Sequence, residues 1–292
     1  MRSISQKTLG SLILVLVSIL WGTSFPLIKI VTIIIDANGY VAFRFLITVL
    51  ILLPYFIHVL LKRRNELYKV IKPGTILGLI YFGGIFLQGI GTKYTTASNS
   101  GFITSFYIPL VYAIDVLKHR LNYSHKLTLA LFLSMLGIYL ISGGSHELRI
   151  GDLIVLISAF FWAFQIIAID RFSKEGFFSL DLVFFQYAVT ALLGLASISS
   201  PPDLGKVIEV FFPLLYLAAI CSVLVGVLQI VGQRYTIASQ ASFIYALEPL
   251  FATLFSFILL GERLDSAELV GAFLIINSVI ISSWEISKKE ND

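Results

Sequence analysis

A carboxylate and a proline stand side by side inside a long apolar stretch, at Glu248 and Pro249. A charge in hydrocarbon costs about 3 kcal/mol or more, so such a residue normally faces a cavity or a partner. Proline removes a backbone donor, and a broken helix is tolerated at membrane depth where it lines a cavity. Glu248 is therefore a candidate proton carrier or counter-charge for a cationic ligand; a structural carboxyl that caps the break is the alternative. We expect similar helix breaks at Pro26 and Pro109.

A second charge lies within an apolar stretch at Arg44. Its planar guanidinium can bind a carboxylate through two parallel N–H donors. The alternative is an arginine that extends outward to the lipid headgroups with only its aliphatic part buried. The sequence leaves these two placements equally open.

Two tryptophans mark a third group of candidates. Trp21 is followed by Ser24, and Trp162 by Gln165, in two stretches that otherwise match. Each indole lies about twelve residues into its stretch, or about 18 Å at 1.5 Å per residue, which is the middle of a bilayer. Tryptophan usually occupies the headgroup region, so a midplane position favours the wall of a cavity. Simple packing beside small residues is the alternative.

Further polar side chains recur near the helix ends. Gln88 and Gln229 hold matched positions, and Tyr107 and Tyr245 add hydroxyl groups. Matched positions fit a binding site shared by two related halves, and they fit equally well with plain descent from a duplication.

Other kinds of chemistry find no support in the residues. The four histidines are not spaced as metal ligands, and the chain has neither a His-Glu-x-x-His motif nor a Cys/His cluster. The glycine-rich segment from Gly84 to Lys93 lacks the Gly-Lys-Ser/Thr of a phosphate-binding loop. Cys221 is the single cysteine, so no internal disulfide can form. We therefore expect no metal, no cofactor and no enzymatic activity.

These candidates need long apolar helices to hold them. Hydrophobic residues make up 58% of the chain and charged residues 13%, about half the charged share of a soluble domain. A helix needs about 20 mostly apolar residues to cross the hydrocarbon, and ten such stretches predict an all-α integral membrane protein with ten transmembrane helices. They lie roughly at 9–34, 38–61, 74–93, 97–117, 127–144, 151–171, 179–199, 211–232, 238–260 and 265–284.

The chain contains the same apolar half twice. A motif that begins at Leu87 recurs at Leu228, and its glutamines are 141 residues apart (229 − 88 = 141). The two tryptophans share this offset (162 − 21 = 141). A duplicated unit with an odd number of spans must lie in opposite orientations in its two copies, as in many transporters. We therefore expect two inverted five-helix repeats, residues 1–144 and 145–292.

Basic residues concentrate in every second loop. By the positive-inside rule, their distribution places both termini in the cytoplasm. Attraction to anionic lipid accounts for the net charge of +4, so no nucleic-acid partner is expected. Asp115 lies close to this basic side and is expected to pair with it. The basic side holds Arg2, Lys7, Lys62, Arg63, Arg64, Lys69, Lys72, Lys118, Arg120, Lys126, Arg171, Lys174, Arg234, Lys288 and Lys289, and the other side only Lys29, Lys93, Arg149, Lys206 and Arg263.

Four runs of residues resemble the EamA-type family of the drug/metabolite transporter superfamily. The resemblance implies a secondary carrier that moves small metabolites, often outward, through a central cavity between two repeats, without ATP or a soluble cofactor. His119-Arg120 stands where the family has Glu-Arg. The stretch at 151–171 lacks the proline that Pro26 supplies in the stretch at 9–34. The two halves are therefore not expected to be equivalent gates. The runs are Ser18 to Pro26, which is similar to the family's opening signature, and Tyr94 to Ser98, Ala246 to Leu250 and Leu260 to Leu264, which are similar to its repeat endings.

From the residues and the resemblance we expect a secondary active transporter in the cell (inner or plasma) membrane. It would export small metabolites, such as amino acids or aromatic and amphipathic compounds, by alternating access. The alternatives are a passive facilitator and a polytopic sensor or assembly partner that transports nothing. Its expected partners are a small-molecule substrate and the lipid bilayer, and it would act as a monomer or homodimer. The expected substrate-binding residues are Trp21, Ser24, Arg44, Gln88, Tyr107, Trp162, Gln165, Gln229, Tyr245 and Glu248, with Glu248 also carrying a coupled proton.

Overall fold

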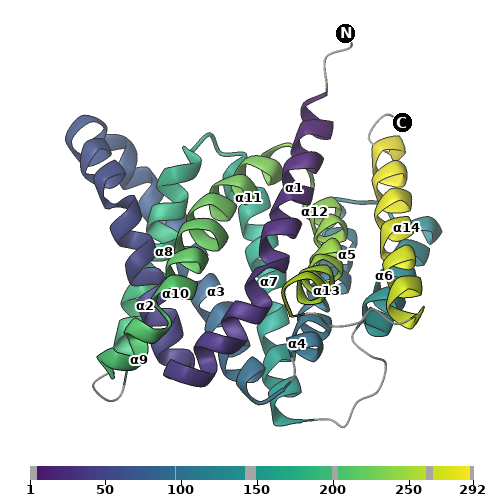
Figure 1. Ribbon diagram of the computed structural model, residues 1–292. Coiled ribbons are helices and arrows are strands. Elements are labelled where there is room, and N and C mark those ends of the chain that lie inside the picture. Colours follow the sequence, from purple (N-terminus) through teal and green to yellow (C-terminus); the bar gives the residue numbers. More distant parts are fainter. Residues whose placement is uncertain (1–4, 96, 142–148, 199–202, 261–265, 290–292) are drawn as a thin grey trace.

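Helices make up all the regular secondary structure of the part of the chain that is described (Figure 1). The computed structural model describes residues 5–95, 97–141, 149–198, 203–260 and 266–289. The helices are α1 (Gln6–Gly22), α2 (Ser24–Lys62), α3 (Arg64–Lys93), α4 (Ala97–Thr104), α5 (Tyr107–Leu117), α6 (His125–Ile141), α7 (Ile150–Ser173), α8 (Ser179–Ala196), α9 (Leu204–Glu209), α10 (Phe211–Ala218), the π-helix η1 (Ala219–Leu224), α11 (Val225–Arg234), α12 (Ala238–Tyr245), α13 (Leu247–Leu260) and α14 (Ser266–Lys289).

Seven helical stretches among the described residues are long and apolar enough to cross a membrane. The first, Gln6–Lys62, has 57 residues, more than twice the ~20 that one crossing needs. It turns at Asp36, whose φ of 60° is unusual for a residue other than glycine. The Asp36 carboxylate accepts the N–H of Gly39 at 2.8 Å and so caps the helix that follows. The chain is thus built as a multi-pass membrane protein, while ten spans and inverted repeats stay predictions.

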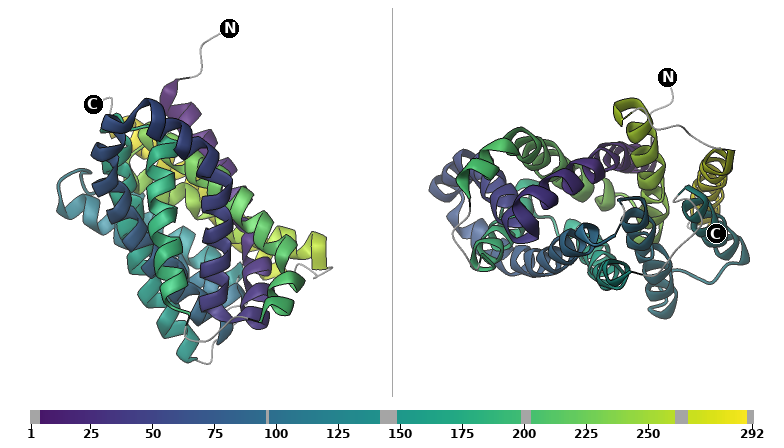
Figure 2. Two further views of the ribbon diagram at one scale, coloured as in Figure 1. Left: turned by 90° about the vertical axis from the view of Figure 1, so that its left-hand side faces the viewer. Right: turned by 60° about the horizontal axis from the view of Figure 1, so that its bottom comes forward.

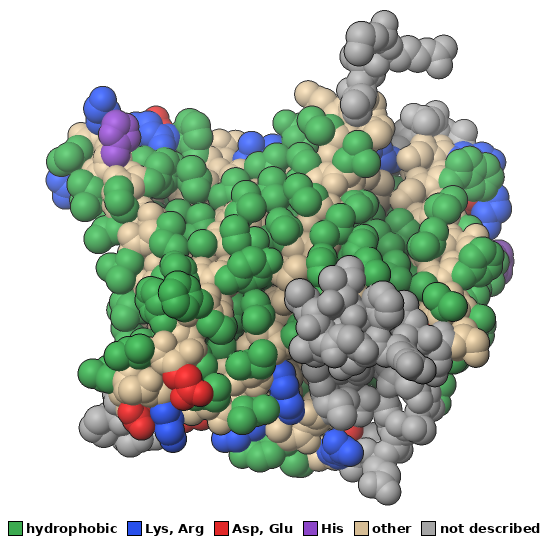
Figure 3. Space-filling model, in the orientation of Figure 1, with side chains coloured by type: hydrophobic (Ala, Val, Ile, Leu, Met, Phe, Trp, Pro, Cys, Tyr) green, Lys and Arg blue, Asp and Glu red, His purple; other side chains and the backbone are tan. Residues whose placement is uncertain are grey.

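The surface has the polarity expected for a molecule that spans a bilayer. Hydrophobic side chains cover the middle of the face in Figure 3, and charged side chains gather along its upper and lower edges. The start of α1 and the end of α14 lie at the same edge (Figures 1 and 2).

Helices of the two halves pack against each other. α3 lies against α7 and α8, α2 against α8, α1 against α11 and α13, and α6 against α14. The buried apolar residues form two clusters, and both Trp21 and Trp162 contact each cluster. The tryptophans therefore lie where the two cores meet.

Glycines permit two of these contacts at matching positions. A Cβ on Gly10 of α1 would lie 2.9 Å from the carbonyl oxygen of Gly232 in α11. A Cβ on Gly151 of α7 would lie 2.6 Å from the carbonyl oxygen of Gly91 in α3. The two pairs differ by the repeat offset (151 − 10 = 141 and 232 − 91 = 141), so the α1–α11 and α7–α3 contacts are equivalent. Such close approach of backbones is how helices associate in lipid.

Replacing Gly151 by Ala is expected to destabilise the protein by about 1–3 kcal/mol. The new methyl group would meet backbone atoms of Gly91 and Tyr94, which cannot rotate away. Thermal unfolding of the purified variant in detergent measures the effect. Gly101→Ala is the matched control, because its Cβ would have no neighbour closer than 3.9 Å. An unchanged melting temperature for Gly151→Ala would contradict the prediction.

Candidate functional site

A cavity lies where the two cores meet. Its empty volume is about 530 Å³, which includes some open solvent at its mouth. All ten residues that were predicted from the sequence to bind substrate line this cavity, together with six other residues. Its lining is Trp21, Ser24, Phe25, Ile28, Arg44, Tyr81, Ile85, Gln88, Thr104, Tyr107, Trp162, Gln165, Ile166, Gln229, Tyr245 and Glu248.

The lining follows the internal repeat of the sequence. Twelve of its residues form six pairs, each separated by 141 positions, so equivalent elements of both halves face the same space. The chemistry within a pair often differs, and Arg44 has no counterpart in the lining. The pairs are Trp21 with Trp162, Ser24 with Gln165, Phe25 with Ile166, Gln88 with Gln229, Thr104 with Tyr245, and Tyr107 with Glu248.

Aromatic rings form much of the wall. Trp21 meets Tyr245 edge to face with ring centroids 5.3 Å apart, and Trp162 meets Tyr81 in the same way at 5.1 Å. Gly84 leaves room for the Trp162 indole, because a Cβ there would lie 3.0 Å from the ring. The Trp162 indole N–H is buried and has no partner, so it is a donor available to a ligand.

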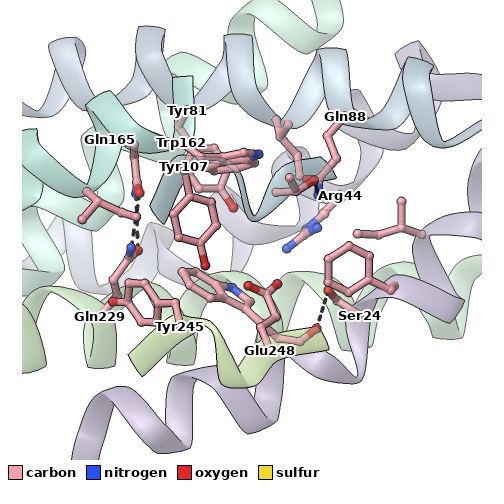
Figure 4. A pocket seen from close by; sticks show the side chains of 16 residues that line it. Ser24, Arg44, Tyr81, Gln88, Tyr107, Trp162, Gln165, Gln229, Tyr245 and Glu248 are labelled. Carbon is pink, nitrogen blue, oxygen red and sulfur yellow. Dashed lines mark hydrogen bonds between the residues drawn. The ribbon is translucent and has the colours of Figure 1, made fainter. Parts of the chain in front are cut away.

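Glu248 extends into the cavity from a helix break (Figure 4). α12 ends at Tyr245 and α13 begins at Leu247. Pro249 cannot donate to the carbonyl of Tyr245 one turn earlier, which is the physical reason for a break here. Among the described residues, no side chain forms an ion pair with the Glu248 carboxylate. Its carboxyl group therefore has no ion-pair partner within the part of the cavity that is described.

The two other prolines that were expected at helix breaks, Pro26 and Pro109, lie close to helix junctions as well. α1 gives way to α2 at Thr23, three residues before Pro26. α4 ends at Thr104 and α5 begins at Tyr107, two residues before Pro109. Both junctions bring cavity residues, Ser24 and Tyr107, to the ends of their helices.

Arg44 reaches the cavity from α2 and does not extend to the lipid interface. It is 2% exposed. Nε donates to Oγ of Ser222 at 2.9 Å, Nη2 donates to the carbonyl of Cys221 at 3.3 Å, and Nη1 donates to the Tyr40 hydroxyl. A guanidinium has five N–H donors, so these three bonds leave two for a ligand.

A π-helical turn receives Arg44. In η1 the Ser222 hydroxyl donates to the carbonyl of Leu217, five residues earlier, at 3.0 Å. Tyr187 donates to the Ser222 carbonyl at 3.1 Å, and Arg44 binds the carbonyl before it. Wider turns of this kind occur frequently at functional sites. Side chains of α2 and α8 thus satisfy two carbonyls of this turn.

The glutamines bond mainly to other side chains of the wall. Gln165 and Gln229 donate to each other at 3.3 and 3.2 Å, and Gln88 donates to the Thr104 hydroxyl at 3.2 Å. Ser24 donates to the carbonyl of Trp21 at 2.7 Å (Figure 4). The Tyr107 hydroxyl, in contrast, is buried without a partner.

Several residues of the lining were not predicted from the sequence. Thr104 could have been found, because the repeat offset pairs it with Tyr245 (245 − 104 = 141). Tyr81 has no such signal: its counterpart is Ser222 (222 − 81 = 141), which bonds Arg44 but does not line the cavity.

Asp115 was expected to pair with the nearby basic side. It does not pair with the basic residues that follow it. Its Oδ2 accepts the backbone N–H of Ser239 at 2.9 Å and the Ser239 hydroxyl at 2.6 Å. A carboxylate at the first turn of a helix satisfies free N–H groups and complements the helix dipole. Asp115 therefore links α5 to the start of α12. The motif from Gly261 to Leu264 lies outside the described residues.

Comparisons with known proteins agree with this architecture. An uncharacterized transporter of Archaeoglobus fulgidus is 32% identical over 281 residues, covering 96% of this chain and 88% of the relative. The uncharacterized transporter YyaM of Bacillus subtilis is 28% identical and covers 92% of each chain. A solved structure, titled only as the crystal structure of a protein, has a TM-score of 0.74 at 17% identity and covers 99% of this chain and 100% of its own. That likeness shows a shared fold.

The family model for EamA-like transporters matches the chain twice, over residues 8–143 and residues 149–284. The two matches correspond to the internal repeat that is visible in the sequence and in the lining of the cavity. The chain therefore belongs to the EamA-like transporter family.

Proposed function

We propose that this protein is a secondary transporter that exports small amphipathic metabolites, such as amino acids or aromatic compounds, through the cavity. The relatives are named as transporters, and the family model covers both halves. The chemistry of the cavity supplies the more specific part of the proposal.

The observation that carries the proposal is a pair of opposite charges on one aromatic cavity. Arg44 retains two free donors, and Glu248 has a carboxyl group without an ion-pair partner among the described residues. No ion pair joins them among the described residues, and both point into the space in Figure 4. A substrate with a carboxylate, a cationic or polar group and an apolar body can bind both charges and the aromatic wall. A multiply phosphorylated sugar would need several buried cations, whereas the described residues of the lining supply one.

Alternating access requires that the two halves present the cavity to opposite sides in turn. The opposite directions of α1 and its repeat equivalent α7 in Figure 1 support inverted repeats. Both ends of the described chain lie at one edge, and this position supports an even number of membrane crossings. The loops that are rich in basic residues favour a cytoplasmic position for that edge. They also favour the cell membrane as the location of the protein. Glu248 would carry the coupled proton.

Transport into and out of proteoliposomes tests the proposal. The purified protein would be assayed with labelled amino acids and aromatic metabolites, with and without a pH gradient. Saturable, gradient-dependent flux of one class is the expected result. Flux that ignores the gradient would indicate a passive facilitator, and the absence of flux for every compound would favour a sensor or assembly partner that transports nothing.

Tyr107→Phe is expected to raise KM several-fold with little change in stability. The hydroxyl is buried in the cavity and has no protein partner, so its bond to a substrate would be lost while the ring stays in place. One neutral hydrogen bond contributes about 0.5–1.5 kcal/mol, or roughly two- to tenfold in affinity. Concentration dependence of uptake measures KM. Tyr245→Phe offers a comparison, because that hydroxyl already donates to Gln233 at 3.4 Å; equal KM values for wild type and Tyr107→Phe would contradict the prediction.

A further inference from the structure

One segment of the molecular edge carries four exposed cations that form no ion pair among the described residues, while its Arg63 pairs with Glu66 and Asp181. It lies at the junction of α2 and α3, where Lys62, Arg64, Lys69 and Lys72 are all exposed. We name these four residues the basic collar. Among the described residues, no carboxylate forms an ion pair with any of them. Figure 3 shows basic side chains gathered at this upper corner of the molecule.

Four other cations of the same edge are compensated by carboxylates. Arg120 and Lys174 pair with Asp170 at 3.5 and 2.6 Å. Lys126 pairs with Glu285 at 3.4 Å, and Arg171 with Glu175 at 3.4 Å. The four cations of the basic collar therefore differ from these four, because no carboxylate among the described residues pairs with them.

Apolar and aromatic side chains accompany the basic collar. Leu61 is 80% exposed and directly precedes it, at the end of a helix whose lipid-facing side is apolar. Tyr68 is 57% exposed and accepts a hydrogen bond from Nε of Arg64 at 3.0 Å. Leu67 and Val70 face inward and hold the first turns of α3 against the protein. This arrangement of buried apolar, interfacial aromatic and exposed basic residues is typical of a helix at the headgroup level.

We infer that the basic collar binds the headgroups of anionic phospholipids. A soluble acidic partner would not explain why cations and strongly exposed apolar side chains alternate on one helix junction. A bilayer explains both, because Leu61 contacts acyl chains while the cations contact phosphate oxygens. Lysine and arginine near an anionic membrane surface each add to the attraction.

Lipid binding to the purified full-length protein tests this inference. Native mass spectrometry would follow titrations with phosphatidylglycerol and with phosphatidylcholine of the same acyl chains. Wild-type protein is expected to bind phosphatidylglycerol more tightly. Replacing all four collar residues by Gln is expected to weaken phosphatidylglycerol binding at least about tenfold, since each cation near an anionic surface contributes a several-fold gain. Binding of phosphatidylcholine should stay the same.

Two control variants separate this site from general charge effects. Exchanging Lys for Arg and Arg for Lys at all four positions preserves charge and should preserve binding. Replacing Arg120, Lys126, Arg171 and Lys174 by Gln removes four charges from the same edge and should change binding less than about twofold. Equal losses in the two Gln variants, an unchanged affinity of the collar variant, or competition by a soluble polyglutamate peptide at matched charge would each overturn the inference.

Discussion

Replacing Glu248 by Gln is expected to abolish transport driven by a pH gradient while leaving the exchange of substrate across the membrane active. Glutamine has nearly the same size and keeps hydrogen bonding, but it cannot take up and release a proton. Among the described residues of the cavity lining, Glu248 is the one acidic residue, and its repeat equivalent is Tyr107. No second carboxyl of the described lining can therefore replace it. Accumulation of substrate in proteoliposomes with an imposed pH gradient measures the effect.

Exchange of unlabelled for labelled substrate at equal pH provides the control for folding. A Gln variant that still exchanges substrate but no longer accumulates it has lost coupling alone. Glu248→Asp keeps an ionisable group on a shorter side chain, so gradient dependence should survive at a lower rate. A Gln variant with full activity and an unchanged response to pH would refute the role of Glu248 as proton carrier.

The repeat explains why so much of the candidate site could be predicted from the sequence. Residues that the 141-residue offset relates occupy equivalent places, so a polar or aromatic residue at one midplane position draws attention to its partner. Trp21 and Trp162, and Gln88 and Gln229, were found in this way and line one cavity. Glu248 was found by a different route, since the cost of a charge in hydrocarbon implies a cavity or a partner.

Features that depend on tertiary contacts could not be predicted. Periodicity and hydropathy leave Arg44 free to turn inward or outward; its burial depends on Tyr40, Ser222 and the Cys221 carbonyl, which lie up to 178 residues away. The π-helical turn η1 contains no glycine or proline from which it could have been predicted. The Ser222 bond to Leu217 and the side chains that satisfy its carbonyls accompany that turn. Asp115 was assigned to the nearest cations because the approach of α12 is invisible in the local sequence.

Replacing Arg44 by Gln is expected to weaken substrate binding on the order of tenfold to a hundredfold, because a hydrogen bond to a charged group contributes about 1.5–3 kcal/mol. The guanidinium is held by Ser222, Tyr40 and the Cys221 carbonyl, and it points into the cavity in Figure 4. Arg44→Lys keeps the charge but loses the planar fork, and we expect it to recover only part of the affinity. Substrate concentration dependence of exchange in proteoliposomes gives the apparent affinities.

A substrate analogue without the carboxylate separates recognition by Arg44 from general damage to the fold. Wild-type protein should favour the carboxylate compound over the corresponding amine, and Arg44→Gln should reduce this preference. Ser222→Ala removes one of the three anchors without removing the charge, so its effect on the preference should be a few-fold at most, as for one hydrogen bond of about 1 kcal/mol. An Arg44→Gln variant that binds both compounds more weakly by the same factor would show that Arg44 stabilises η1 and does not contact the substrate carboxylate. Because the two readings predict different ratios, and not merely different activities, the experiment distinguishes them even if the variant is less stable.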